Sequence, residues 1–365
     1  MELSGKMIEV NSKKIGKNQP VFVVAEIGKN FIQTEESRPT EEYLANAKEL
    51  IKAAKEVGAD AVKFQTHNLD DEQLNFDITS PHFSGSDRYS WIKRNTEATP
   101  VEFWQELKRY AEDLGIIFFS TPMSKGAAEI LEQVDVPLWK VSSGDILDFV
   151  MLDYIAQTNK LIIISSGMSS LEELDKSVDF LKKKIDRIIL MHCVSKYPCP
   201  PEDLNLKTIE FLKKRYDLPV GFSDHSLGQQ GALAAIELGA VVIEKHFSFS
   251  RDLWGADHKV SMTPAEFKQM VEDIKAGKKS EIKNYGQESK ILSSDEEIFR
   301  PVFRKSLVAA RDLKSGLVLT KKDIFAMRPQ QYINGLPSEE YENVLNKKII
   351  KDLKQYDPIT LDTIN

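Results

Sequence analysis

The sequence predicts an α/β fold, a (β/α)8 TIM barrel with a small β-rich domain at its C-terminal end. Three observations lead to this prediction. About eight short runs of apolar, often β-branched residues recur along the first two thirds of the chain, and a closed parallel barrel has this number of strands. The runs are almost continuously apolar, as strands buried on both faces are. Amphipathic helical patterns separate the runs, which indicates βα units and a parallel sheet.

The expected strands follow one another at residues 21–28, 61–66, 116–121, 138–144, 161–168, 187–194, 220–225 and 241–247. The helical patterns between them include "TEEYLANAKELIKAAKEVGA" and "PVEFWQELKRYAEDLG", which reach helix-terminating glycines at Gly58 and Gly115. A doubly wound open sheet is the alternative fold. It favours a G-x-G-x-x-G turn after the first strand, and "AEIGKNFIQ" does not contain one.

The composition changes after Ile274, where charged residues replace aliphatic ones. We therefore predict a barrel domain over residues 1–280, a linker over residues 281–300 and a second domain over residues 301–365. The second domain has short β-like pieces and a K-S-G turn. It is too small to be very stable alone, so we expect it to dock on another surface.

Charge and cysteine content narrow the classes of function. The formal net charge is -7, whereas nucleic-acid binding needs a basic face. The two cysteines, Cys193 and Cys199, favour a reducing compartment. The N-terminal stretch "MELSGKMIEVNSKK" has no apolar signal core, and no run of about eighteen apolar residues occurs. We expect a soluble, cytoplasmic protein with no membrane or nucleic-acid partner.

Polar side chains stand at the C-terminal ends of the expected strands, where (β/α)8 barrels build their active sites. Serines and threonines at these positions can simply mark where a strand stops. This does not account for Lys63 and Lys140, because an unpaired ammonium group inside an apolar run is costly to desolvate. Two ammonium groups beside hydroxyls suit a small anion that carries phosphate and carboxylate. The expected hydroxyls are those of Thr121, Ser143, Ser165, Ser195 and Ser223. Glu26, at the end of the first strand, is the expected acid or base beside them.

Two of the six histidines, His225 and His246, lie at the ends of the last two strands. Side chains alternate along a strand, so Ser223 shares a face with His225, and Glu244 shares a face with His246. Because these strands are neighbours in a barrel, both imidazoles are expected to project from the same rim. Two imidazoles with open positions suit a divalent metal such as Mn, Fe, Co or Zn. The alternative is that each histidine forms a local hydrogen bond.

Nine motifs carry a resemblance to a known family. In order they are "AEIGKN", "ADAVKFQT", "STPMS", "WKVSSGD", "SSGMSS", "HCVSKYP", "GFSDHS", "EKHF" and "GADHKVSMTP". They resemble the motifs of the sialic acid synthase family, which includes N-acetylneuraminate, legionaminate and pseudaminate synthases. The C-terminal segment resembles the antifreeze-like SAF domain of this family. The resemblance implies an enzyme that condenses phosphoenolpyruvate with an N-acyl hexosamine.

The resemblance also implies roles for individual residues. Glu26 matches the catalytic glutamate, and His225 and His246 match the metal ligands, with manganese as the expected cation and magnesium or cobalt as alternatives. The positions that bind phosphoenolpyruvate match Lys63, Thr121, Lys140, Ser143, Ser165 and Ser223. The positions that contact the sugar match Asp145, Tyr197 and Asp257. Arg328 matches an arginine that reaches the sugar's acyl group from the partner subunit, which implies a homodimer with exchanged C-terminal domains.

The implied reaction is a C–C bond-forming transfer. Phosphoenolpyruvate, water and N-acetylmannosamine or a 6-deoxy-diacetamido sugar would give a nine-carbon 2-keto acid and phosphate. The metal would polarise the aldehyde of the open-chain sugar, and Glu26 would help water to add. Two alternatives are a metal-dependent aldolase or related sugar-phosphate synthase on the same barrel, and a non-catalytic carbohydrate-binding protein.

The chain departs from the family pattern at several places. Phe31 replaces the histidine of A-E-I-G-x-N-H, and Ser195 stands where many members have asparagine. After Arg328 the chain reads "RPQQYING", without the glycines of R-P-G-x-G, which changes the backbone options of that loop. The segment of residues 67–100 is long, and it is either a lid over the sugar or a surface excursion.

Overall fold

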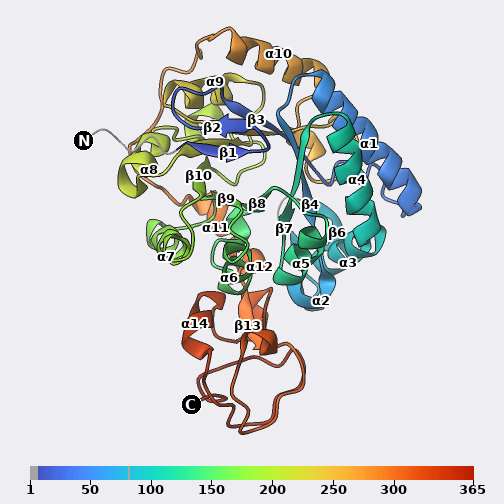
Figure 1. Ribbon diagram of the computed structural model, residues 1–365, viewed down its shortest axis with the longest axis vertical. Helices are drawn as coiled ribbons and strands as arrows, with labels where there is room; N and C mark the ends of the chain where they lie inside the picture. Colours follow the sequence, from blue (N-terminus) through green and yellow to red (C-terminus); the bar gives the residue numbers. More distant parts are fainter. Residues whose placement is uncertain (1–6, 81–82) are drawn as a thin grey trace.

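The computed structural model consists of a large barrel with a narrower C-terminal lobe at one end (Figure 1). It describes residues 7–80 and 83–365. Eight strands form one parallel sheet in the order β7-β4-β3-β12-β11-β10-β9-β8. In chain order these strands are β3 (Phe22–Gly28), β4 (Ala61–Thr66), β7 (Ile117–Pro122), β8 (Leu138–Val141), β9 (Leu161–Ser165), β10 (Ile188–Cys193), β11 (Val220–Asp224) and β12 (Val242–His246). Because β7 and β8, the two ends of this order, pack side by side, the sheet curls into a nearly closed barrel. The predicted (β/α)8 fold is confirmed, and the open sheet was the wrong alternative.

A helix follows each barrel strand. In chain order these helices are α1 (Thr40–Glu56), α4 (Val101–Asp113), α5 (Lys125–Gln133), α6 (Phe149–Ala156), α7 (Leu171–Lys182), α8 (Thr208–Tyr216), α9 (Gln230–Glu237) and α10 (Pro264–Lys275). Several start where the sequence carries a local signal. For example, Ser170 and Glu173 form a capping box at the start of α7, and their side chains satisfy backbone N–H groups that have no partner within the helix.

The barrel interior is apolar at one end and polar at the other. Side chains alternate along a strand, so every second residue faces inward. Val24 and Phe119 belong to a buried apolar cluster inside the barrel, and the next inward positions on the same strands are Glu26 and Thr121. The interior is packed so closely that a Cβ atom on Gly221 would lie 2.4 Å from the sulfur of Met191. The same alternation therefore builds a core and, above it, a ring of polar groups.

Two further pieces complete the barrel domain. A hairpin of β1 (Ile8–Val10) and β2 (Lys13–Ile15) adds its apolar residues to the interior cluster at the start of the strands. A long insertion between β4 and α4 contains α2 (Leu69–Glu72), β5 (Thr79–Ser80), β6 (Phe83–Asp87) and α3 (Arg88–Ala98). Residues 81–82 of this segment, for which a lid and a surface excursion were the two expectations, lie outside the described residues. Short 3-10 turns follow three of the strands, at η1 (Ser143–Asp145), η2 (Pro201–Asp203) and η3 (His258–Val260).

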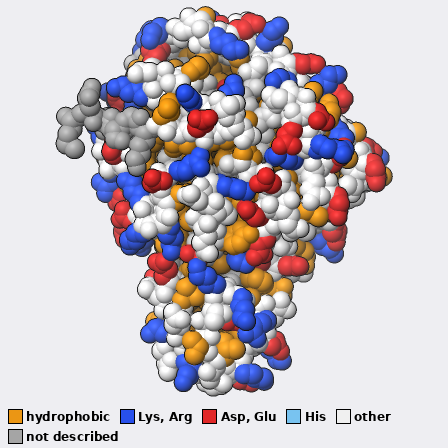
Figure 2. Space-filling model, in the orientation of Figure 1, with side chains coloured by type: hydrophobic (Ala, Val, Ile, Leu, Met, Phe, Trp, Pro, Cys, Tyr) orange, Lys and Arg blue, Asp and Glu red, His pale blue; other side chains and the backbone are white. Residues whose placement is uncertain are grey.

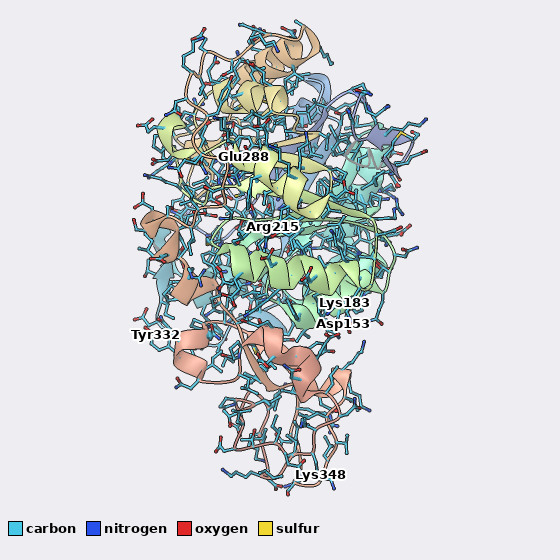
Figure 3. All side chains as sticks on the ribbon, turned by 90° about the vertical axis from the view of Figure 1, so that its left-hand side faces the viewer. Asp153, Lys183, Arg215, Glu288, Tyr332 and Lys348 are labelled. Atoms are coloured by element: carbon cyan, nitrogen blue, oxygen red, sulfur yellow. The ribbon has the colours of Figure 1, made fainter. Side chains whose placement is uncertain are left out.

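The C-terminal lobe is small and docks on the barrel of the same chain. Its elements are α11 (Ser294–Glu297), α12 (Arg300–Phe303), β13 (Ser306–Ala309), η4 (Lys321–Asp323), β14 (Ile324–Met327), α13 (Gln330–Ile333), η5 (Ser338–Glu340) and α14 (Tyr341–Val344). Figure 3 shows Asp153 of the barrel near the junction with the lobe and Lys348 at the far end of the lobe. Asp153 pairs with Lys321 across this junction, and the Ser338 hydroxyl donates to the Leu147 carbonyl at 2.7 Å.

The altered loop after Arg328 forms α13. Asn334 follows this helix with a φ of 56°, in the left-handed region, so an asparagine occupies the conformation that glycine most often supplies at a helix end. On the face drawn in Figure 2, positive and negative side chains are interspersed over the barrel and the lobe. Among the described residues, no helix has the length and apolar character that crossing a bilayer requires.

Candidate active site

A pocket opens at the C-terminal rim of the barrel, above the apolar interior. It is lined by most of the residues predicted from the strand ends and from the motifs. These are Glu26, Lys63, Thr121, Lys140, Ser143, Ser165, Ser195, Tyr197, Ser223, His225, His246 and Asp257. They come from widely separated parts of the chain, so the barrel topology brings them together.

Lys63 lies between two carboxylates. Its Nζ is 2.9 Å from Oε2 of Glu26 and 3.7 Å from Oε2 of Glu244, and it donates to the Thr121 hydroxyl at 3.1 Å. Burial raises the pKa of Glu26 to about 7, with Glu244 adding to the rise and Lys63 opposing it. Burial also acts to raise the pKa of Glu244, but Lys140 and Lys63 outweigh it and lower that pKa to about 2. The two carboxylates therefore differ at neutral pH: Glu244 is ionised, and Glu26 is poised to gain or lose a proton.

Lys140 and a group of hydroxyls form a cradle for an anion. The Lys140 ammonium donates to the Ser165 hydroxyl at 2.6 Å, and the backbone N–H of Gly167 donates to the Ser143 hydroxyl at 3.1 Å. A Cβ atom on Gly167 would lie 2.4 Å from the hydroxyl of Ser195, so glycine is needed for this close approach. The Ser195 hydroxyl is buried and has no hydrogen-bond partner among the described residues. The cradle thus offers donors to a ligand with several oxygen atoms.

His225 and His246 lie side by side, as predicted, with ring centres 5.4 Å apart. Nδ1 of His225 bonds to the Val194 carbonyl at 2.9 Å, which leaves its Nε2 for another partner. Nδ1 of His246 is buried without a hydrogen-bond partner among the described residues. Burial lowers the pKa of His246 to about 4, so its imidazole is neutral at neutral pH, as a metal ligand must be.

These two imidazoles fit a divalent cation with open coordination positions. A metal–nitrogen bond is about 2.1 Å long, so rings at this separation can share one ion. Within the described part of the chain, no cluster of three or more His, Cys, Asp or Glu residues is arranged to hold a metal. The remaining positions would therefore fall to water or substrate oxygens.

Tyr197 and Asp257 stand beside the histidines. The ring centre of Tyr197 is 4.2 Å from that of His225, and Oδ2 of Asp257 is 4.0 Å from Nδ1 of His246. Gly28 allows Asp257 to approach Glu26, since a Cβ atom on this glycine would lie 3.2 Å from a carboxylate oxygen of each.

Asp145 and Arg328 do not belong to the described pocket wall. They pair with each other, and Lys305 joins them with its Nζ 3.0 Å from Oδ1 of Asp145. Lys305 also lies 2.7 Å from Asp148. All of these side chains are buried between the lobe and the barrel. In this structure Arg328 thus faces Asp145 of its own chain, and its exchange between subunits stays a prediction.

The pocket also contains residues that the strand pattern did not indicate. The insertion after β4 contributes His67, Arg88 and Trp91, and the lobe contributes Phe299 and Phe303. The insertion therefore helps to form the pocket wall, which favours the lid over the surface excursion. Lys29, which directly follows β3, is a further addition.

Comparison with known proteins agrees with the motifs. The NeuB family model matches residues 50–285, and the SAF domain model matches residues 304–365. The chain belongs to the NeuB family. Residues 304–365 of its C-terminal lobe form a SAF domain, as the resemblance implied.

Several relatives of this NeuB family member align over nearly its whole length. An uncharacterized protein of Methanocaldococcus jannaschii is 36% identical over 98% of this chain and 98% of its own. The human N-acetylneuraminate-9-phosphate synthase is 32% identical over 96% of this chain and 94% of its own. The N,N'-diacetyllegionaminic acid synthase of Campylobacter jejuni is 34% identical over 85% of this chain and 92% of its own. Among solved structures, the spore coat polysaccharide biosynthesis protein spsE of Bacillus subtilis is similar with a TM-score of 0.80, 30% identity and 99% coverage of both chains.

Proposed function

We propose that this chain is a nonulosonic acid synthase. It condenses phosphoenolpyruvate with an N-acyl hexosamine and water to give a nine-carbon 2-keto acid and phosphate. The observation that carries the proposal is the pocket itself, in which Lys63, the anion cradle around Lys140, a carboxyl group with a pKa of about 7 and two neighbouring imidazoles converge. The names of the synthase relatives support the same class of reaction.

Each group has a task that follows from its position. Lys63 and Lys140, with the hydroxyls of Ser143 and Ser165, bind the phosphate and the carboxylate and so orient the enol. C3 of the enol forms the new bond to the aldehyde carbon, which leaves C2 electron-deficient and the aldehyde oxygen as an alkoxide. Water adds to C2 and gives one proton to Glu26, whose pKa of about 7 suits it to accept the proton and pass it to the alkoxide, which becomes a hydroxyl. The C2–OH of the resulting adduct then gives up its proton as the C–O bond to phosphate breaks, so phosphate leaves with that proton and the ketone forms at C2.

His225 and His246 are the residues that would hold the metal, with manganese expected and magnesium or cobalt as alternatives. A divalent cation bound there would supply Lewis-acid polarisation of the aldehyde oxygen. Tyr197 and Asp257, beside the histidines, would place the sugar so that its aldehyde faces the enol.

The C-terminal lobe is proposed to shield the sugar end of the pocket. Phe299 and Phe303, which come just before the segment that the SAF domain model matches, already form part of the pocket wall in the single chain. In the proposed homodimer the C-terminal lobes are exchanged, and each one makes these contacts with the barrel of the other subunit. Water exclusion of this kind protects reactive intermediates.

The test is to incubate the protein, phosphoenolpyruvate and Mn2+ with N-acetylmannosamine, and with 6-deoxy-diacetamido mannose and altrose in turn. Release of inorganic phosphate together with a nine-carbon 2-keto acid, identified by mass, is the expected result. An aldolase would instead release pyruvate from such an acid without phosphoenolpyruvate. Failure of every sugar to give phosphate would overturn the proposal and favour a carbohydrate-binding protein.

A further inference from the structure

Met168 has a backbone conformation that is unusual for its side chain. It lies shortly after β9 with a φ of 51°, in the left-handed region that bulky residues rarely adopt. Its side chain is almost fully buried and lines the pocket. Strained conformations of this kind persist only where the surrounding structure holds them, and they cluster at functional sites. The contacts that hold Met168 therefore indicate how this side of the pocket is built.

Both backbone polar groups of Met168 bond to side chains of the C-terminal lobe. The N–H donates to Oε1 of Glu296 at 3.0 Å. The carbonyl accepts from Nη1 of Arg300 and from Nη2 of Arg304, each at 3.1 Å. Both arginines also pair with Glu173 in the first turn of α7, which keeps their guanidinium groups in place. Three side chains from one short segment of the lobe thus hold one strained residue of the barrel.

Glu296 also reaches the segment that follows the neighbouring strand. The same Oε1 accepts the backbone N–H of Ser195, just beyond β10, at 3.0 Å. Its other oxygen accepts from the N–H and the hydroxyl of Ser293 at 3.3 and 3.2 Å, and this capping box sets the direction of the side chain. Glu296 is only 1% exposed and is not on the described pocket wall. One carboxylate oxygen behind that wall therefore ties together the loops after β9 and β10.

These two loops carry part of the anion cradle. Gly167, next to Met168, donates its N–H to the Ser143 hydroxyl at 3.1 Å. The hydroxyl of Ser195 packs so closely on Gly167 that a Cβ atom there would lie 2.4 Å from it. A change of the backbone at Met168 or Ser195 would therefore move the hydroxyls that face the ligand.

We propose that Glu296 is a positioning residue for the anion cradle, which holds the loops after β9 and β10 in the arrangement that binds phosphoenolpyruvate. This inference rests on the proposed function, since it assigns a further residue to the binding of that substrate. Glu296 acts as a hydrogen-bond acceptor and not through its charge, because a negative charge behind the cradle opposes the binding of an anion. In an exchanged homodimer the same contacts would join two subunits.

The test compares three variants by calorimetric titration with phosphoenolpyruvate. Glu296→Ala removes the shared acceptor of two buried N–H groups, and loops that keep the competent arrangement in about one molecule in ten bind about tenfold more weakly. The KM for phosphoenolpyruvate is expected to rise by the same factor, and the KM for N-acetylmannosamine to stay within about twofold. Glu296→Gln keeps an oxygen for both N–H groups and removes the charge, so it is expected to bind phosphoenolpyruvate at least as tightly as the wild type. Glu297→Ala, exposed on the same helix, is the matched control that keeps the affinity.

Hydrogen exchange at the amides of Met168 and Ser195 measures the two contacts without any ligand, and both amides are expected to exchange faster in Glu296→Ala than in the control. The titration is repeated with inorganic phosphate as the probe. If the wild type binds phosphate, Glu296→Ala binds it about tenfold more weakly and no sugar reacts, the inference stands and the proposed function alone fails. If Glu296→Ala does not fold, Glu296→Asp takes its place, because the shorter side chain keeps the charge and withdraws the acceptor oxygen.

Three results would overturn the inference. The first is an unchanged affinity for both anions despite faster exchange at the two amides. The second is an equal loss of affinity for phosphoenolpyruvate and for the sugar, which would reduce Glu296 to a contact that docks the lobe. The third is a Glu296→Gln variant that binds phosphoenolpyruvate as weakly as Glu296→Ala.

Discussion

Glu26 and Glu244 share Lys63, and this sharing predicts a specific pH behaviour. With a pKa of about 7, roughly a tenth of Glu26 is ionised at pH 6 and nine tenths at pH 8. If ionised Glu26 accepts the proton of water, kcat/KM rises about tenfold over that interval. Glu26→Gln is expected to lose most of its turnover while it still binds phosphoenolpyruvate. The measurement is a pH profile of phosphate release at low substrate concentration.

Glu244→Gln gives the sharper result, because it removes a neighbouring negative charge. Lys63 Nζ lies 2.9 Å from one carboxylate and 3.7 Å from the other, so the two oxygens are within about 6.6 Å of each other. Two unit charges at this distance repel by roughly 2.5 kcal/mol at an effective dielectric constant of about 20, which is nearly two pKa units. The ascending limb in Glu244→Gln is therefore expected to move to lower pH by one to two units.

Substrate ionisation can produce an ascending limb but cannot produce this shift, since the substrate is the same in both proteins. Apparent pKa values of such a pair belong to the pair, so the shift between variants is the quantity to compare. A limb that stays in place or moves upward in Glu244→Gln would refute the coupling. Near-normal turnover by Glu26→Gln would assign the proton transfer to another group.

Three further predictions concern the metal, the anion cradle and the assembly. His225→Ala and His246→Ala are each expected to abolish metal-dependent turnover and to weaken Mn2+ binding in calorimetry; chelator-resistant turnover would contradict the metal site. Lys140→Met is expected to weaken phosphoenolpyruvate binding by about tenfold or more and sugar binding much less, and unchanged affinity in titration would exclude Lys140 from the cradle. Mixing Arg328→Ala chains with Glu26→Gln chains is expected to restore part of the activity, because one site of an exchanged homodimer then receives both intact residues. Mixed dimers that regain nothing would show that each SAF domain covers its own barrel.

The sequence was most informative where the backbone is regular. Strand ends meet at one rim and side chains alternate with period two, so the positions of Lys63, Thr121 and Ser223 follow from the sequence pattern. The eight strands and the SAF domain were also predicted, and both are confirmed. Phe31, the most obvious departure in the first motif, is fully buried and packs against the rings of Phe103 and Trp104.

Residues from irregular segments were harder to place. Arg88 lines the pocket because the insertion after β4 folds back over the rim. The insertion has no periodic pattern from which this path could be predicted. Lys29 carried a usable signal, because it is a lysine directly after a strand. It lies in a turn, however, and the alternation of side chains along a strand does not predict the direction of a side chain there. Arg328 shows the opposite case: the motif indicates a sugar contact, but in the single chain Asp145 and the Glu72 backbone already hold it.

The C-terminal lobe contacts the pocket wall directly and also contacts the turn η1 next to it. The turn η1 holds Ser143, which faces the anion cradle, and Asp145, which pairs with Arg328 and Lys305 of the lobe. Between them, Gly144 lets Phe303 approach so closely that a Cβ atom would lie 3.0 Å from its ring. Losing the lobe would remove the cations that pair with Asp145 and Asp148 and the ring that packs on Gly144, so the turn η1 would lose contacts on its lobe side. Because Ser143 belongs to the same short turn, that loss is expected to reach the phosphoenolpyruvate end of the pocket. The lobe is therefore expected to influence both substrates, although Phe299 and Phe303 are the only lobe residues on the described pocket wall.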